Sequence, residues 1–250
     1  MKSQKNILAI VGIRAGSSEL KNKNIKLLGK KHLVGWILDA AKKSKYINRI
    51  LVSTDSTKYQ KIVKKYKIDA PFLRPKNLSK NNSNEIDFVK HALNYLKKKE
   101  NYKPDIIVRM LATVPFQKTK DVDKLIDMIL NKKYKSAVVI TKAKQLPKKA
   151  LKIIGKNKKY LVSYETNSGI DVGRKLNRQK KNNQEDNVYF RSNVICCTLD
   201  VIEKFNSLTD NKVGYLIIPN KEFIDIDNQE DFEYAEYLYL KNLKTQAIDS

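Results

Sequence analysis

The feature that most constrains the fold is an alternation of short apolar runs with longer amphipathic stretches. The apolar runs carry polar ends and read as buried strands; they are residues 7–13, 49–54, 105–111, 136–141 and 214–219. Between them, hydrophobic residues recur at helical spacing in residues 33–44, 57–66, 85–99 and 121–130. Strand and helix in repetition predict an α/β domain with a mostly parallel sheet, which binds ligands at the carboxyl ends of its strands.

The alternation is interrupted over residues 142–188, which are rich in lysine and asparagine, and resumes with the apolar run NVYFRSNVICC. A long structureless loop is unusual in a compact domain. We therefore expect an extension that packs on a second subunit, or a lid, rather than a disordered linker. The last stretch, residues 228–243, has tyrosines and leucines at helical spacing, and we expect its tyrosines to pack in the core.

The formal charge of +25 comes almost entirely from lysines spread along the chain, while arginine, the usual reader of bases and phosphates, is scarce. This spread favours a solvated surface, and a basic RNA-binding α/β protein remains an alternative. No run approaches the roughly 20 apolar residues of a membrane span, and the amino terminus lacks a signal-peptide pattern. We expect a cytoplasmic protein without nucleic-acid or membrane partners, in which the adjacent Cys196 and Cys197 are buried, reduced strand residues.

The turn after the first strand, GIRAGSSELKNKNIKLLGK, has the composition of an anion site. It lacks both the P-loop ending and the spacing of a dinucleotide fingerprint. The N–H groups of Gly16 and Ser17 can surround phosphate oxygens as a backbone nest, while Arg14 and Lys23 neutralise their charge. A solvated basic turn accounts for the same residues equally well.

Two aspartate-bearing segments add to this signal. STDS (53–56) ends the second strand, where an aspartate also commonly caps the next helix. Asp225 and Asp227 are two residues apart in FIDIDNQEDFEYAE, so a strand would place both carboxylates on one face. Two carboxylates that close suit a Mg²⁺ ion bound to a nucleotide. The alternative is a pair of strand-end aspartates that cap the following helix.

With these residues in order, the chain resembles the cytidylyltransferases that activate nonulosonic (sialic-type) acids as CMP-sugars. The family's opening loop, A-R-x-G-S-K-x-x-x-x-K-N, is matched by Arg14, Gly16, Ser17, Lys23 and Asn24. The later matches, in chain order, are GKKHLVGWILDAAKKS, VSTD (52–55), Arg74 with Pro75 and Leu78, HAL (91–93), Pro115, Arg178 with Gln179, Asn193, and IDID with its trailing D…AE.

The resemblance implies a Rossmann-like three-layer α/β nucleotidyltransferase with a mostly parallel sheet, forming one domain over residues 1–250. Residues 142–188 would be an inserted dimerisation arm, and the protein a homodimer. The substrates would be CTP and a nonulosonic acid, with Mg²⁺ held by Asp225 and Asp227. The other implied roles are catalysis for Arg14 and Lys23 together with the two aspartates, nucleotide binding for Arg14, Gly16, Ser17, Lys23, Asn24, Arg74 and Asn84, and sugar binding for Leu111, Arg178, Gln179 and Asn193.

Several positions depart from the family pattern. Ser18 replaces a lysine, which removes one expected phosphate contact. Leu111 replaces a glutamine expected to contact the sugar, and Val194 replaces a glycine. These changes leave the sugar open, and a related enzyme that uses another nucleotide such as GTP, or a sugar 1-phosphate, is the alternative. No general base stands out, because His32 and His91 lie outside the suspected site loops.

Overall fold

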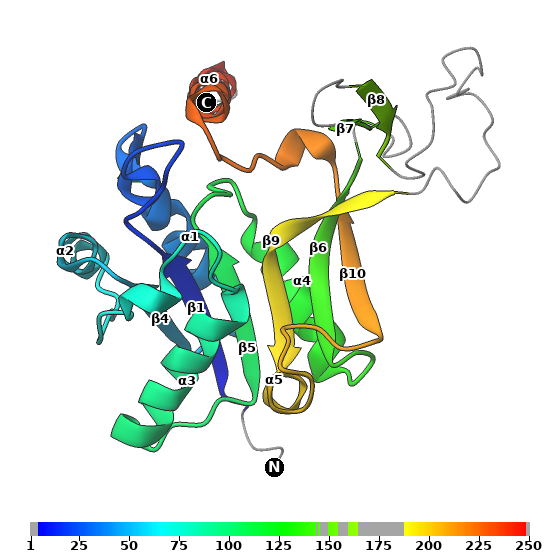
Figure 1. The fold of residues 1–250 in the computed structure, drawn as a ribbon. Coiled ribbons are helices and arrows are strands. Elements are labelled where there is room, and N and C mark those ends of the chain that lie inside the picture. The colour runs from blue at the N-terminus through cyan, green and yellow to red at the C-terminus, as the bar shows by residue number, and fades with distance from the viewer. Residues whose placement is uncertain (1–4, 144, 146–149, 155–159, 165–187, 249–250) are drawn as a thin grey trace.

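A six-stranded sheet forms the centre of the molecule, which a computed structural model describes for residues 5–143, 145, 150–154, 160–164 and 188–248 (Figure 1). Its strand order is β10-β6-β9-β5-β1-β4. The strands are β1 (Ile7–Ile13), β4 (Arg49–Thr54), β5 (Ile106–Leu111), β6 (Ser136–Lys142), β9 (Tyr189–Thr198) and β10 (Val213–Ile218). The five strands predicted from the apolar runs are confirmed to within one residue at each end.

The sheet is mostly parallel, as the alternation predicted. β1 pairs in parallel with β4 and β5, and β10 pairs in parallel with β6. β9 is the exception, since it lies antiparallel between β5 and β6. It carries Cys196 and Cys197, both buried and unbridged, as expected, and burial raises the pKa of Cys197 to about 12.

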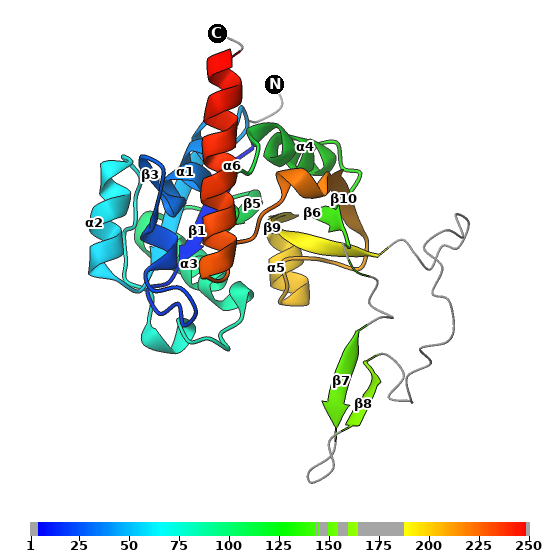
Figure 2. The ribbon, with the colours of Figure 1, turned by 90° about the horizontal axis from the view of Figure 1, so that it is seen from above.

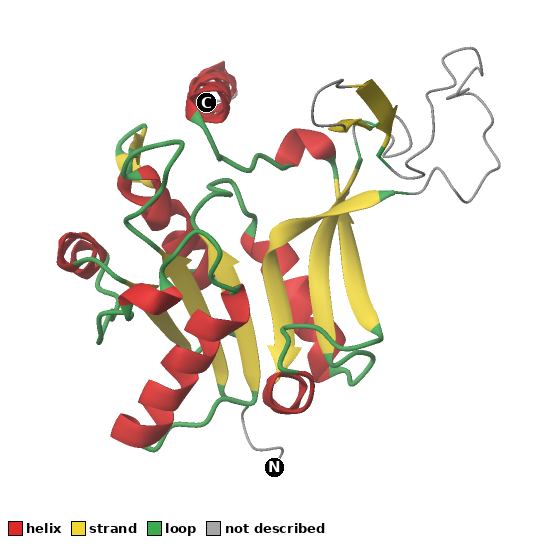
Figure 3. Cartoon of the chain, in the orientation of Figure 1, coloured by secondary structure: helices red, strands yellow, loops and turns green. Residues whose placement is uncertain are grey.

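Helices cover both faces of the sheet and complete three layers (Figure 3). On one face, a core cluster joins the sheet to α1 (Leu33–Lys42), α2 (Thr57–Lys65) and α4 (Thr119–Leu130). On the other face, a second cluster joins it to α3 (Glu85–Glu100) and α5 (Leu199–Phe205). The helices α1, α2, α3 and α4 bury the apolar stripes that their spacing predicted, so the three-layer α/β expectation is confirmed.

The long helix α6 (Gln229–Ile248) lies beyond the carboxyl ends of β1 and β5, at the top of Figure 1. A third apolar cluster fixes it to the short β2 (Leu27–Leu28) and the start of α1. Phe232 is 2% exposed in this cluster, but Tyr234 and Tyr237 are 52% and 57% exposed and stack on each other. The expectation that the tyrosines of this stretch pack in the core is therefore wrong for these two, because the helix touches the domain along a narrow stripe.

Residues 142–188 contain a two-stranded hairpin of β7 (Leu151–Ile154) and β8 (Tyr160–Ser163). Figure 2 shows this hairpin set away from the six-stranded sheet. Most of the remaining segment, including Arg178 and Gln179, lies outside the described residues. The role of this insertion as a dimerisation arm or lid stays a prediction.

A tight turn fixes α6 in place and provides a test of this packing. Gly29 has φ +62° in the turn between β2 and β3 (Lys31–His32), and a Cβ there would lie 2.3 Å from the ring of Tyr239. The left-handed conformation alone costs a residue with a side chain about 1–2 kcal/mol. We expect Gly29→Ala to lower the free energy of unfolding in urea by at least that much. Gly16→Ala is the control, because a Cβ at Gly16 meets nothing within 4 Å; an equal loss in both variants would contradict this packing.

Candidate active site

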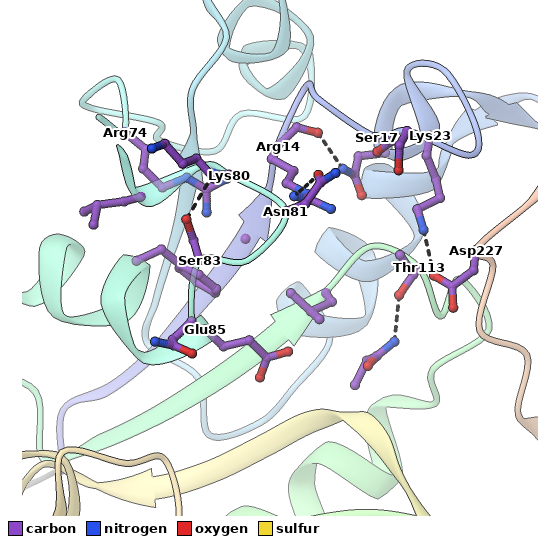
Figure 4. Close-up of a pocket in the computed structure, with 18 of the residues that line it drawn as sticks. Arg14, Ser17, Lys23, Arg74, Lys80, Asn81, Ser83, Glu85, Thr113 and Asp227 are labelled. Carbon is purple, nitrogen blue, oxygen red and sulfur yellow. Dashed lines mark hydrogen bonds and ion pairs between the residues drawn. The ribbon is translucent and has the colours of Figure 1, made fainter. Parts of the chain in front are cut away.

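A pocket of about 500 Å³ opens at the carboxyl ends of β1 and β5 (Figure 4). Its walls come from the loop after β1, the segment between β4 and α3, the end of β5, β9, and the segment before α6. The residues of this wall that the sequence predicted are Arg14, Ser17, Lys23, Asn24, Arg74, Asn84, Leu111, Asn193, Asp225 and Asp227. Side chains from these five segments thus converge on one cavity.

The loop after β1 is held in shape by side chains around it. The amide of Asn24 donates to the carbonyl oxygen of Arg14 at 2.9 Å, and the guanidinium of Arg14 donates to Asn81 Oδ1 at 2.7 Å. The backbone N–H of Ala15 donates to Asp55 Oδ1 at 2.9 Å. Asp55 therefore ties this loop to the end of β4, while Ser56 performs the capping of α2.

Of the two N–H groups predicted to form a backbone nest, that of Ser17 already has a partner within the loop. The N–H of Ser17 donates to the carbonyl of Ala15 at 3.1 Å, so it is not free for a phosphate oxygen. Gly16 is exposed and lies outside the pocket wall. The loop therefore presents its positive charge mainly through side chains.

Lys23 comes from the 3-10 helix η1 (Lys23–Ile25), and its Nζ lies 2.8 Å from Asp227 Oδ1. Its side chain is only 13% exposed, whereas that of Asp227 is 66% exposed. Lys23 is therefore not an exposed loop lysine, because the stem of its side chain packs along the wall. The ammonium group is thereby fixed at the mouth of the pocket.

Asp225 lies deeper than Asp227 and is held by neutral donors. Asn193 Nδ2 donates to Asp225 Oδ1 at 2.9 Å and to Thr113 Oγ1 at 2.6 Å. Burial raises the pKa of Asp225, and the nearby negative charge of Asp227 raises it further. Hydrogen bonds from Thr113 and Asn193 lower this pKa, but by less. The two carboxylates are therefore close enough to repel each other.

The segment that carries both aspartates is not a strand, contrary to the sequence-based expectation. Ile224 and Ile226 are buried, at 7% and 0% exposed, so the predicted alternation of faces is correct. The backbone of this segment is tied to the loop after β5 by the N–H of Ile226, which donates to the carbonyl of Thr113 at 2.8 Å.

Helix capping does not explain Asp225 and Asp227. Asn228 and Asp231 cap the start of α6. Asn228 Oδ1 accepts a hydrogen bond from the N–H of Asp231 at 2.9 Å, and Asp231 Oδ2 accepts one from the N–H of Asn228 at 3.2 Å. This is the arrangement of a capping box. Capping therefore does not account for the two carboxylates that face the pocket, which removes the structural alternative raised by the sequence.

Arg74 forms the opposite wall, 6% exposed. Its Nε donates to Ser79 Oγ at 3.1 Å, and its guanidinium lies 5.3 Å from the centre of the Phe88 ring. Burial lowers the pKa of Arg74. Its Nη2 has no hydrogen-bond partner among the described residues, and a buried unpaired donor is costly. A ligand that accepts a hydrogen bond there would remove this cost.

The pocket also contains residues that the sequence did not single out, among them Glu19, Thr113 and Glu85. Glu85 begins α3 and pairs with Arg109, which is wholly buried on β5. A lone arginine inside the apolar run IIVRML is itself a signal, because a buried charge requires a partner. His32 and His91 do not line the pocket, as expected.

The donor set suits a hard cation that is shared with a ligand. Asp225 and Asp227 are oxygen donors whose mutual repulsion a cation would relieve. In the described part of the chain, no three His, Cys, Asp or Glu side chains gather into a complete metal-ligand set. A divalent ion held here would therefore take its remaining ligands from water or a bound phosphate.

These features define an α/β protein with a charged pocket at the carboxyl edge of its sheet, the place where such folds bind ligands. A family model described as cytidylyltransferase matches residues 8–249, and the chain belongs to that family. The resemblance seen in the sequence is thereby confirmed, and the chain is identified as a nucleotidyltransferase.

Curated relatives match along most of the chain. An N-acylneuraminate cytidylyltransferase of Escherichia coli O18:K1:H7 is 27% identical over 97% of this chain, which spans only 54% of that longer protein. A CMP-N,N'-diacetyllegionaminic acid synthase of Campylobacter jejuni is 25% identical, and the match covers 95% of this chain and 97% of that protein. A pseudaminic acid cytidylyltransferase of Campylobacter jejuni is 24% identical, and the match covers 94% of this chain and 97% of that protein.

Among solved structures, a CMP:2-keto-3-deoxy-manno-octonic acid synthetase complexed with CTP has a TM-score of 0.67 at 14% identity. The match covers 95% of this chain and 99% of that one, and at this identity it confirms the fold.

None of the helices in the described part of the chain combines the length and hydropathy that a membrane span needs.

The raised pKa of Asp225 has a consequence for stability. A carboxyl whose pKa rises on folding favours its protonated form, so its ionised form at neutral pH lowers stability. We expect Asp225→Asn to leave the melting temperature at pH 7, without divalent ions, unchanged or slightly higher.

The matched control is Asp200→Asn. Hydrogen bonds from Thr198 and Lys135 lower the pKa of Asp200, so its ionised form stabilises the fold at pH 7 and its removal should lower the melting temperature. If Asp225→Asn instead unfolds the protein, Asp225 is a structural residue.

Proposed function

We propose that this chain transfers CMP from CTP to the anomeric hydroxyl of a nonulosonic (sialic-type) acid and releases pyrophosphate. The observation that carries the proposal is the convergence of Arg14, Lys23 and Arg74 with two carboxylates on one pocket. The names of the curated relatives, which refer to three acids of this type, support the choice of acceptor.

In the proposed reaction, the anomeric oxygen attacks the α-phosphorus, and the bond from that phosphorus to the bridging oxygen of pyrophosphate breaks. Catalysis of such a transfer depends on in-line positioning and on neutralising charge on the phosphate oxygens. Arg14 and Lys23 would bind the triphosphate from the mouth of the pocket. Arg74, with Asn84 and the residues just before it, would bind the base from the opposite wall.

The charge of the pocket supports a role for Mg²⁺. Its wall has four basic side chains, Arg14, Lys23, Arg74 and Lys80, and four acidic ones, Glu19, Glu85, Asp225 and Asp227. These formal charges cancel, so a bound cation is needed to favour a triphosphate. We infer that Asp225 and Asp227 hold Mg²⁺, which when bound would neutralise phosphate charge and lower the pKa of the attacking hydroxyl.

We further propose that the single domain, residues 1–250, dimerises through the insertion at 142–188. The hairpin of β7 and β8 exposes Leu151, Ile153 and Leu161 by 46%, 66% and 49%. Exposed apolar side chains grouped on one hairpin are typical of a surface that a partner covers. Arg178 and Gln179 of the same insertion would then contact the sugar.

The proposed reaction predicts nucleotide and metal requirements. Pyrophosphate release should need CTP, Mg²⁺ and one acid from a panel of N-acetylneuraminic, pseudaminic and N,N'-diacetyllegionaminic acids, and excess chelator should abolish it. Each of the four nucleoside triphosphates is assayed with each acid. A preference for GTP would support a nucleotidyltransferase but contradict the assignment of CTP as its substrate. No pyrophosphate release with any acid would reject the proposal.

Lys23 provides the most direct test of phosphate binding. Lys23→Ala removes a fixed positive charge and should lower kcat/KM for CTP by roughly 10²–10³, as for other electrostatic donors. Lys21→Ala, in the same loop but exposed and outside the pocket wall, is the control. Equal turnover of the two variants at limiting CTP would reject this role for the loop.

The proposed assembly is tested by light scattering at micromolar concentration, which should give twice the mass of the chain. Ile153→Asp places a charge on the exposed hairpin and should yield monomers. Phe205→Asp is the control, since Phe205 is 46% exposed on α5. A monomeric wild type with full activity would rule the dimer out.

A further inference from the structure

Arg109 is the largest fully buried side chain of the described residues, yet it is poorly satisfied. Its Nη1 donates to the carbonyl of Asn193 at 3.0 Å, and its Nη2 lies 3.1 Å from Glu85 Oε2. Neither Nε nor Nη2 has a hydrogen-bond partner among the described residues, so the contact with Glu85 is an ion pair without hydrogen-bond geometry. Burial lowers the pKa of Arg109 to about 10, so it stays charged at neutral pH. Such a group is costly in a core, which suggests a role beyond stability.

Glu85 is the partner that brings this charge to the pocket. It is the first residue of α3, its side chain is 34% exposed, and it lines the cavity. Arg191 on β9 approaches the same Oε2 atom at 3.7 Å. Both arginines therefore approach Oε2 of the carboxylate, and Oε1 has no hydrogen-bond or ion-pair partner among the described residues.

The position of Glu85 separates it from the phosphate-binding groups. It lies across the pocket from the Lys23–Asp227 pair (Figure 4). A carboxylate repels phosphate oxygens, so the part of a ligand that reaches Glu85 must instead carry hydrogen-bond donors. Leu111, two residues beyond Arg109 on β5, adds an apolar side chain to this part of the wall.

A hydrogen-bond chain connects this region to the reaction centre. The backbone carbonyl of Asn193 accepts a hydrogen bond from Arg109, and the side-chain amide of Asn193 donates one to Asp225. The space bounded by Glu85, Leu111 and Asn193 thus adjoins the carboxylates assigned above to Mg²⁺. The acceptor must reach this neighbourhood for its hydroxyl to attack the α-phosphorus.

We propose that Glu85, held by Arg109, is a specificity-determining residue for the acceptor, an inference that rests on the proposed function. Its carboxylate accepts a hydrogen bond from an N–H or O–H group of the sugar acid, and Leu111 contacts an adjacent apolar group. The site therefore selects acids with a donor beside a methyl or methylene group.

The test uses Glu85→Gln, which keeps the size of the side chain and removes its charge. With the acid that the wild type uses best, KM for the acid should rise about 10-fold to 100-fold, the effect of one lost charged hydrogen bond. The affinity for CTP, measured by calorimetry, should stay within about twofold of wild type. Asp87→Asn is the matched control, because it removes a charge from the same helical turn outside the pocket wall.

Three results would overturn the inference. An unchanged KM for the acid with a lower melting temperature would make the ion pair purely structural. A weaker affinity for CTP with an unchanged KM for the acid would place Glu85 on the nucleotide. If Glu85→Gln fails to fold, Glu85→Gln/Arg109→Leu removes both charges and should show the same rise in KM; a normal KM in that variant would reject the role.

Assays of the wild type distinguish failure of the proposed function from failure of this inference. Turnover of none of the three acids by wild type rejects the proposed function, and this inference with it. Turnover by wild type combined with equal KM values for wild type and Glu85→Gln rejects this inference alone.

Discussion

The site depends on the two hydrogen bonds that the Asn193 amide donates. They join β9, the loop after β5 and the segment before α6, at 2.6 Å to Thr113 and 2.9 Å to Asp225. The bond from Ile226 N–H to the Thr113 carbonyl closes the same junction. Without these donors, the half-buried Asp225 carboxylate would have to remain exposed to water or become protonated.

The remaining walls follow from this junction. The loop after β1 approaches it because Lys23 pairs with Asp227, and Asp55 ties the same loop to β4. Arg109 reaches it from the core through the carbonyl of Asn193. Charges of both signs are thus held close to one cavity by specific partners, an arrangement that suits a ligand with its own dense charge.

Much of the fold could be predicted from the sequence, since period-two and period-3.6 patterns report burial directly. The direction of β9 could not, because the pattern of a buried strand is the same in either direction. The exposure of Tyr234 was also missed, since helical spacing does not show how broad the contact face of a helix is. In these cases, tertiary packing decides.

The site was predicted less completely. Spacing placed Asp225 and Asp227 together, although on an unpaired segment rather than a strand. The motif matches led to Arg14 and Arg74, but Glu85 was missed because an acidic residue in the first turn of a helix is ordinary. Only its distance to Arg109 distinguishes it, and that contact joins residues far apart in the sequence.

The central claim is that Asp225 and Asp227 form a cation site shared with the triphosphate of a nucleotide. Calorimetric titration of CTP with and without Mg²⁺, into wild type and into Asp225→Asn/Asp227→Asn, tests it most directly. We expect Mg²⁺ to tighten CTP binding by the wild type and to have little effect on binding by the double variant. An equal effect of Mg²⁺ on both proteins would contradict the claim.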